Sequence, residues 1–128
     1  MSYLLDTHIL LWAAAGSDRL TSAARRLIDD PANTHVFSAA SLWEVAIKSG
    51  LGRNDFQVDA QRLRKGLIDS GYVELPVTGA HAAAVAGLPP VHRDPFDRLL
   101  IAQAQVEGLE FVTADRILAQ YGGPIRLV

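Results

Sequence analysis

The chain contains no cysteine among its 128 residues. This absence excludes a disulfide framework, a thiolate zinc site and a cysteine nucleophile, and it is compatible with the reducing cytoplasm in which we expect the protein to act. No apolar run approaches the length of a membrane span, so we expect no membrane association. Residues 1–6 lack a basic segment and reach an acid too early for a signal peptide.

Several motifs of other enzyme classes are also missing. The chain has neither a Gly-x-x-x-x-Gly-Lys-Ser/Thr loop nor a Gly-x-Gly-x-x-Gly fingerprint, which argues against nucleotide cofactors. No serine lies in a Gly-x-Ser-x-Gly turn, and the four histidines lack the spacing of a zinc site. The net charge of −2 argues mildly against a nucleic-acid binder. The sequence nevertheless contains one cluster of basic residues, which could be either a solvated surface or a rim that binds phosphate groups. Its members are Lys48, Arg53, Arg62, Arg64 and Lys65.

Short apolar segments alternate with helical patterns along the chain. The patterns predict strands over residues 3–5, 35–38, 72–75, 110–112 and 125–128. They predict helices over residues 8–15, 21–30, 41–49, 59–70, 78–86, 94–107 and 115–121. Such alternation is typical of an α/β fold in which helices cover both faces of a parallel sheet. Because no linker divides the chain, we expect a single domain over residues 1–128.

Four acidic residues stand at the edges of apolar segments, where a strand or a helix would meet the rim of the sheet. They are Asp6, Glu44, Asp97 and Asp115. Ligands of open α/β sheets gather at the carboxyl ends of the strands, so we expect these side chains to converge there. Carboxylates that converge repel one another unless a cation lies between them. The pattern therefore predicts a magnesium or manganese site and phosphoryl chemistry.

Some of these acids also have a purely structural interpretation. Asp6 and Asp115 each stand where a helix N-cap is expected, and aspartate is well suited to that position. Ser41 and Glu44 fit a capping box, in which the glutamate returns to the amide of the capping serine. Ser38 offers an alternative, because it could cap a helix that begins earlier and so free Glu44 for the site.

The residues around these acids have less certain roles. Asp94 precedes a proline at the first helical position, so we expect it to cap that helix and not to bind metal. Asp97 then falls in the first turn, where the helix dipole is expected to lower its pKa. The hydroxyl of Thr113 is placed to hold a metal-bound water, and His8 more simply fits a half-buried residue at a helix start than a catalytic one.

Four blocks of the sequence carry a family resemblance. They are Leu4-Leu-Asp-Thr-His8, Ser38-Ala-Ala-Ser-Leu-Trp-Glu-Val-Ala-Ile-Lys48, His92-Arg-Asp-Pro-Phe-Asp-Arg-Leu-Leu-Ile-Ala-Gln-Ala104 and Val112-Thr-Ala-Asp115. In this order and spacing, across nearly the whole chain, they resemble PIN-domain ribonucleases of the VapC-like toxin group of type II toxin–antitoxin pairs. The resemblance implies a three-layer α/β/α fold with a short, mostly parallel sheet of four to five strands. It also implies that the catalytic and metal-binding residues are Asp6, Glu44, Asp97 and Asp115.

The resemblance further implies a Mg²⁺- or Mn²⁺-dependent endoribonuclease that hydrolyses RNA phosphodiester bonds and acts as the toxin of such a pair. The implied partners are an RNA substrate, a cognate antitoxin and a second copy of the chain in a homodimer. Many relatives have serine or asparagine at the position of His8. A flap-type DNA nuclease is a weaker alternative, because this length leaves little room for additional helices. A non-catalytic binding module is also weaker, because all four acids are present.

The segments 42–49 and 59–70, with the loop between them, combine apolar and basic side chains. Some of the apolar residues must be core, but the set is larger than one short helical pair needs, and an apolar patch rimmed by charge marks an interaction site. We therefore expect an antitoxin segment to dock there. The residues of this predicted groove are Trp43, Ile47, Leu51, Phe56, Lys48, Arg53, Arg62 and Arg64.

Overall fold

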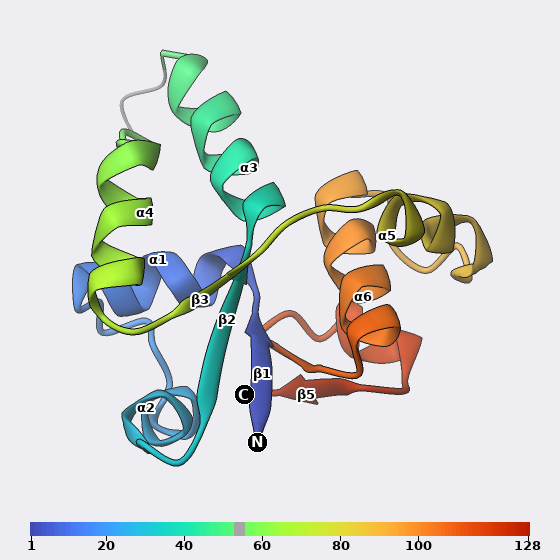
Figure 1. The fold of residues 1–128 in the computed structure, drawn as a ribbon, viewed down its shortest axis with the longest axis horizontal. Coiled ribbons are helices and arrows are strands. Elements are labelled where there is room, and N and C mark those ends of the chain that lie inside the picture. The colour runs from blue at the N-terminus through green and yellow to red at the C-terminus, as the bar shows by residue number, and fades with distance from the viewer. Residues whose placement is uncertain (53–55) are drawn as a thin grey trace.

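A computed structural model describes residues 1–52 and 56–128, so Arg53 of the predicted groove lies outside the described residues. This part of the chain forms a five-stranded sheet in the order β3-β2-β1-β4-β5, and every neighbouring pair is parallel (Figure 1). The strands are β1 (Ser2–Leu5), β2 (Thr34–Ser38), β3 (Val73–Leu75), β4 (Glu110–Thr113) and β5 (Ile125–Leu127). The predicted parallel α/β sheet is confirmed.

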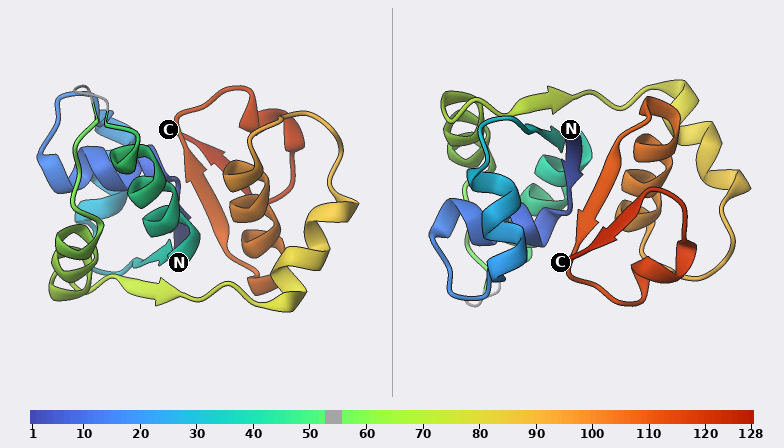
Figure 2. Two further views of the ribbon diagram at one scale, coloured as in Figure 1. Left: turned by 90° about the horizontal axis from the view of Figure 1, so that it is seen from above. Right: turned by 90° about the horizontal axis from the view of Figure 1, so that it is seen from below.

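Helices cover both faces of the sheet, as the two views in Figure 2 show. One layer contains α1 (Thr7–Ala15), α2 (Ser22–Asp29) and α4 (Ala60–Asp69). The other contains α5 (Gly79–Ala84), the 3₁₀ helix η1 (Val85–Gly87), α6 (Pro95–Glu107) and the 3₁₀ helix η2 (Leu118–Tyr121). The remaining helix, α3 (Ala39–Gly50), continues from the end of β2 beyond the sheet (Figure 1). Within the described ranges, no helix combines the length and the apolar character needed to cross a membrane.

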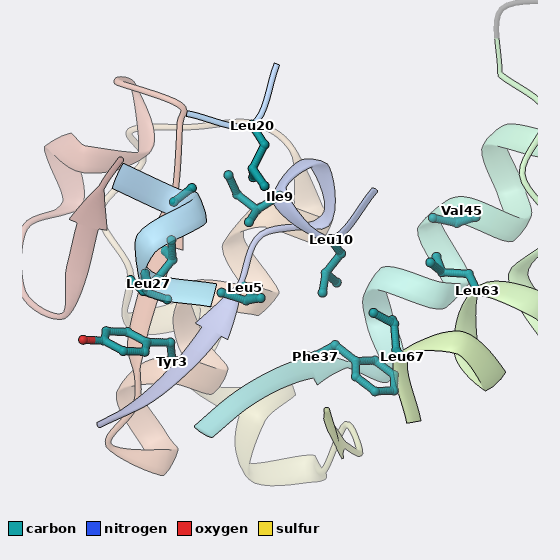
Figure 3. Close-up of a cluster of buried hydrophobic side chains, with 12 residues drawn as sticks. Tyr3, Leu5, Ile9, Leu10, Leu20, Leu27, Phe37, Val45, Leu63 and Leu67 are labelled. Carbon is teal, nitrogen blue, oxygen red and sulfur yellow. The ribbon is translucent and has the colours of Figure 1, made fainter. Parts of the chain in front are cut away.

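Neighbouring residues of a strand face opposite helical layers. Tyr3 and Leu5 of β1 pack into the cluster formed with α1, α2 and α4 (Figure 3), whereas Leu4 between them packs against α6. The same division separates Phe37 from Val36 in β2. Because both faces of the sheet are apolar and covered, polar side chains from the strands are accommodated at the strand ends.

The start of α3 decides between the two interpretations of Glu44. Ser38 is the N-cap, and its Oγ accepts a hydrogen bond from the Ala40 N–H at 3.0 Å. The helix therefore begins at Ala39, two residues before the predicted range. Ser41 lies inside the helix, so the capping box expected with Glu44 does not form, and Glu44 lies in the second turn.

The predicted helix over residues 115–121 is only partly present. Residues 115–117 form a turn in which Asp115 Oδ1 accepts the Ile117 N–H at 2.8 Å, and helical structure is limited to η2. The predicted helix over residues 78–86 is likewise divided, between α5 and η1. Short polar turns of this kind satisfy backbone groups locally and compete with regular helix.

The carboxyl ends of the strands meet at one edge of the sheet, and the chain changes direction there. Strand β1 pairs with β2 on one side and with β4 on the other. Beyond β1, the Asp6 N–H donates to the Val112 carbonyl at 2.9 Å, which continues the ladder by one step. In open α/β sheets, such a reversal of strand order creates the crevice in which ligands bind.

Candidate active site

Asp6 lies directly after β1 and is only 4% exposed. Its Oδ2 accepts a hydrogen bond from the Thr113 hydroxyl at 2.7 Å, and its side chain makes no capping bond to the described amides of α1. Burial raises the pKa of Asp6, and the Thr113 bond, the charge of His8 and the Thr7 N–H oppose this rise, while the charge of Glu44 adds to it. Asp6 therefore stands at the N-cap position of α1, as one interpretation expected, but its side chain is directed to Thr113 and does not cap the helix.

Glu44 projects from α3 into the protein and is 3% exposed. Its Oε2 accepts a hydrogen bond from Lys48 Nζ at 2.7 Å, whereas its buried Oε1 has no partner among the described residues. Burial lowers the pKa of Lys48, but the bond to Glu44 and the charges of Glu44, Asp94 and Asp97 together raise it. A buried carboxylate oxygen without a partner is costly and is the kind of atom that a cation satisfies.

Asp97 lies in the first turn of α6, which Asp94 caps by accepting the N–H groups of Phe96 at 2.8 Å and of Asp97 at 3.3 Å. The predicted structural role of Asp94 is confirmed. The predicted lowering of the Asp97 pKa is wrong: burial raises that pKa to about 8, and neighbouring carboxylates add to the effect. Those neighbours are Asp6, Asp94, Glu44 and Asp115. The fold thus brings the other three predicted acids within electrostatic reach of Asp97.

Asp115 is held at the end of β4 by its own backbone and by the turn that follows. Its N–H donates to Thr113 Oγ1 at 3.0 Å, and its Oδ1 accepts the Ile117 N–H. Thr113 is fully buried and gives its hydroxyl hydrogen to Asp6. The hydroxyl predicted to hold a metal-bound water is therefore occupied by two protein contacts that join the first and the last acid of the site.

His92 is the residue of this site that sequence reasoning missed. Its Nδ1 lies 3.9 Å from Asp97 Oδ2, and its Nε2 lies 3.8 Å from Asp115 Oδ2. The spacing of the histidines in the sequence does not indicate a zinc site and so gives His92 no role. The sequence feature that could have pointed to it is its position two residues before Asp94, in the same segment as Asp97. His8, which was expected to be half-buried at the start of a helix, is instead exposed and stacks on Trp12 with ring centroids 5.9 Å apart.

The donor chemistry of this edge fits a divalent cation. All four predicted acids offer carboxylate oxygens, which are the ligands that Mg²⁺ and Mn²⁺ prefer. The partnerless Oε1 of Glu44 and the resistance of Asp97 to ionisation are both relieved by a positive charge between the carboxylates. In the described residues, one group of three metal-ligating side chains has an atom from each within 4.8 Å of the others: His92, Asp97 and Asp115. Asp6 and Glu44 are not part of this group.

Comparisons with known proteins identify relatives of this chain. Residues 3–124 match the family described as the PIN domain. The ribonuclease VapC22 of Mycobacterium tuberculosis is 31% identical over 126 residues, which are 94% of this chain and 92% of that protein.

Solved structures show the same fold at lower identity. VapBC2 from Rickettsia felis, bound to a DNA fragment from its promoter, has a TM-score of 0.70 at 14% identity, covering 100% of this chain and 98% of that chain. VapC20 of Mycobacterium tuberculosis, described as a sarcin–ricin loop cleaving toxin, has a TM-score of 0.64 at 19% identity, covering 94% of this chain and 95% of that chain. With the family match and the VapC22 relative both spanning nearly all of its length, this chain belongs to the PIN-domain family, within its VapC-like group.

Proposed function

We propose that this protein is a magnesium- or manganese-dependent endoribonuclease that acts as the toxin of a toxin–antitoxin pair. The observation that carries the proposal is the crowding of acids around Asp97 at the carboxyl edge of the sheet, with the neighbouring Glu44 Oε1 buried and without a partner among the described residues. The likeness to a protein named as a ribonuclease supports RNA as the substrate. The proposed catalytic and metal-binding residues are Asp6, Glu44, Asp97 and Asp115.

In this proposal the four carboxylates hold the metal, which when bound polarises the scissile phosphate and activates a water molecule. The residues of the chain prepare that site. Thr113 orients Asp6 through the bond to Oδ2, and Lys48 holds Oε2 of Glu44 so that Oε1 remains available. Because its pKa is raised to about 8, Asp97 would exchange a proton for a cation held at the site.

The proposed partners follow from the same group of relatives. Complexes of VapB with VapC proteins are among the structural neighbours, which supports a cognate antitoxin for this chain. We also propose a homodimer whose two active sites open onto a shared groove, and action on RNA in the cytoplasm. Antitoxin binding would then restrain the nuclease in the cell.

The exposed face of α3 is the part of the predicted groove that best fits an antitoxin. Trp43, Ile47 and Leu51 are 62%, 41% and 64% exposed, and their spacing of four residues aligns them along one side. Phe56 instead packs against the hydrophobic core, and Arg64 is paired with Glu74 at 2.6 Å. We therefore limit the docking surface to Trp43 and Ile47 of α3 and to Leu51, the C-cap residue that follows the helix, and we call these three residues the α3 stripe.

A cleavage assay tests the proposed activity. A single-stranded RNA of mixed sequence should be cut internally when Mg²⁺ or Mn²⁺ is added and should stay intact in EDTA. A DNA strand of the same sequence serves as the matched substrate. Cleavage of the DNA alone would favour the flap-type alternative, and binding without cleavage of either strand would favour a non-catalytic module. The Asp97→Asn variant should be inactive on RNA, and full activity in that variant would contradict the proposed site.

A further inference from the structure

The loop that carries His92 is anchored from two directions. The His92 N–H donates to the Tyr121 hydroxyl at 2.9 Å, and that hydroxyl lies 3.4 Å from the His92 carbonyl as a donor to it. Arg98 reaches the same hydroxyl at 3.2 Å and the carbonyls of Pro89 at 3.0 Å and Val85 at 3.2 Å. These bonds join η1, the loop, α6 and η2, so the position of His92 is set before any ligand binds.

A backbone contact also selects the tautomer of His92. The Asp94 N–H donates to His92 Nδ1 at 3.0 Å, which makes Nδ1 an acceptor. The proton of the neutral imidazole must then be on Nε2, because one ring nitrogen donates and the other accepts. Nε2 is the nitrogen that faces Asp115 Oδ2 at 3.8 Å.

This tautomer argues against direct coordination of a metal by His92. Binding through Nε2 requires the proton on Nδ1, where it would meet the Asp94 N–H. Binding through Nδ1 requires the loss of that backbone bond. The compact set of His92, Asp97 and Asp115 is therefore better described as two carboxylates beside a fixed N–H donor than as three ligands.

Asp115 is the acid that most needs such a donor. Its side chain is 38% exposed, compared with 15% for Asp97, whereas Asp6 is 4% exposed as a residue. The turn at Ile117 holds Oδ1, whereas Oδ2 accepts no hydrogen bond from the described residues. Metal-binding carboxylates are commonly hydrogen-bonded by a second layer of residues that fixes their direction.

We propose that His92 is the positioning residue for Asp115: its Nε2–H donates to Asp115 Oδ2 when a cation occupies the acid site. This inference rests on the proposed function. It completes a pattern, because Thr113 already orients Asp6 and Lys48 already orients Glu44. In this role His92 does not bind the metal itself. It restricts the conformations of the Asp115 side chain, which does bind the metal.

Two substitutions at this position separate the two ring nitrogens. In His92→Asn, the amide oxygen can replace Nδ1 as acceptor of the Asp94 N–H, but no donor reaches Asp115. In His92→Gln, the longer amide can supply a donor at the place of Nε2, but the Asp94 N–H loses its acceptor. The first variant therefore keeps the loop contact and removes the proposed function, and the second does the reverse.

The measurements are Mn²⁺ affinity by calorimetry and the metal-free melting temperature. His92→Asn should keep the melting temperature near that of the wild type and lose about 10–100-fold in Mn²⁺ affinity. His92→Gln should melt earlier and retain affinity within a few-fold of the wild type. Equal affinity in wild type and His92→Asn would overturn the assignment, as would an equal loss in both variants with the fold intact.

Two further results bear on the assignment. A ¹⁴N coupling from the His92 ring in the pulsed electron paramagnetic resonance spectrum of the Mn²⁺-loaded protein would show direct coordination and would also overturn it. Its absence supports the positioning role. A wild-type protein that binds Mn²⁺ but does not cut RNA leaves the affinity comparison intact and contradicts only the proposed activity. A wild-type protein without Mn²⁺ affinity overturns both.

Discussion

Thr113 donates its hydroxyl hydrogen to Asp6 Oδ2 at 2.7 Å, between residues 107 positions apart in the sequence. The same hydroxyl oxygen accepts the Asp115 N–H at 3.0 Å. A single side chain on β4 thus fixes an acid after β1 and an acid after its own strand. Because Thr113 is fully buried, neither bond competes with water, and both are expected to persist in solution.

Replacing Thr113 by valine should weaken metal binding without disrupting the core. Valine has nearly the same shape but leaves Asp6 without its hydroxyl donor, and hydrogen bonds to charged groups are worth about 1.5–3 kcal/mol. We expect the Mn²⁺ affinity measured by calorimetry to fall about 10–100-fold. Thr113→Ser keeps the hydroxyl and is the matched control. Equal affinities in the valine variant and the wild type would remove Thr113 from the site.

Asp6→Asn should abolish metal-dependent RNA cleavage while the metal-free protein keeps or gains stability. Neutralising one buried acid relieves repulsion with Glu44 and Asp97, and the asparagine oxygen can still accept the Thr113 hydroxyl. The paired measurements are RNA hydrolysis and the melting temperature in EDTA. A large drop in that temperature would revive the N-cap interpretation of Asp6, and normal activity would exclude Asp6 from the mechanism.

The metal-free protein should lose stability as the pH rises from about 4 towards 8. The pKa of Asp97 is raised from 3.8 to about 8 in the folded state, so between these values the native protein binds more protons than the unfolded chain. Its contribution to stability is complete below the unfolded pKa and is lost as the pH rises through the folded pKa. The raised pKa of Asp6 acts in the same direction.

Chemical denaturation in EDTA across this pH range tests the effect. Asp97→Asn should flatten the pH dependence, whereas Asp69→Asn, which alters an exposed acid on α4, should not. Added Mg²⁺ should restore stability most strongly at the alkaline end, since protons compete with the cation for the same oxygens. A stability that rises steadily from pH 4 to pH 8 in EDTA would contradict the crowded site.

Much of this architecture was predictable because it depends on local patterns. Runs of apolar residues gave the strands, and Asp94 before Pro95 gave the start of α6. The position of the acids at strand ends followed from the parallel sheet alone, since parallel strands share one carboxyl edge. Glu44 was less certain, because two serines offered competing starts for α3, and only the packed helix showed that Ser38 is the cap.

Contacts between distant segments were not predictable in the same way. The loop before α6 could be read as a turn, but the bonds from Arg98 and Tyr121 that place His92 depend on how η2 packs. The pKa of Asp97 was predicted in the wrong direction because the helix dipole is visible in the sequence, whereas burial and three-dimensional crowding are not. Such errors arise where the surroundings of a side chain outweigh its local position.

Lys48→Met should destabilise the metal-free protein and decrease its metal affinity. The methionine keeps much of the apolar stem but leaves the buried Glu44 without its cation, which we expect to cost about 1–3 kcal/mol, less than for a fully buried pair because the Lys48 side chain is 41% exposed. Without the bond from Nζ, Oε2 is no longer held and Glu44 no longer keeps Oε1 directed at the site, so metal affinity should fall. The comparison is of unfolding free energies in EDTA and in Mn²⁺.

Lys65→Met is the matched control for that experiment. Lys65 forms the same type of ion pair four residues from Asp69, at 2.6 Å, but these side chains are 78% and 61% exposed. Exposed pairs of this kind contribute little, so the control should change neither stability nor metal affinity appreciably. If Lys48→Met behaved like the control, the Glu44–Lys48 contact would have no role in the site.

The α3 stripe should be needed for antitoxin binding and not for cleavage. Exposed tryptophan is a frequent source of binding energy at interfaces, so Trp43→Ser combined with Leu51→Ser should weaken antitoxin affinity by about tenfold or more. Ile68→Ser, on α4, removes an isoleucine that is 43% exposed, close to the 41% of Ile47, and is the control. Affinity is measured by calorimetry with the antitoxin purified from the neighbouring reading frame, and cleavage on free RNA.

The same double variant tests where the two copies of the proposed homodimer meet. Light scattering at micromolar concentration should give a dimer for the wild type, and a monomer there would contradict the dimer. If the double variant stays dimeric, keeps RNA cleavage and loses antitoxin affinity, the stripe belongs to the antitoxin alone. If it becomes monomeric with unchanged antitoxin affinity, the stripe is instead the surface between copies.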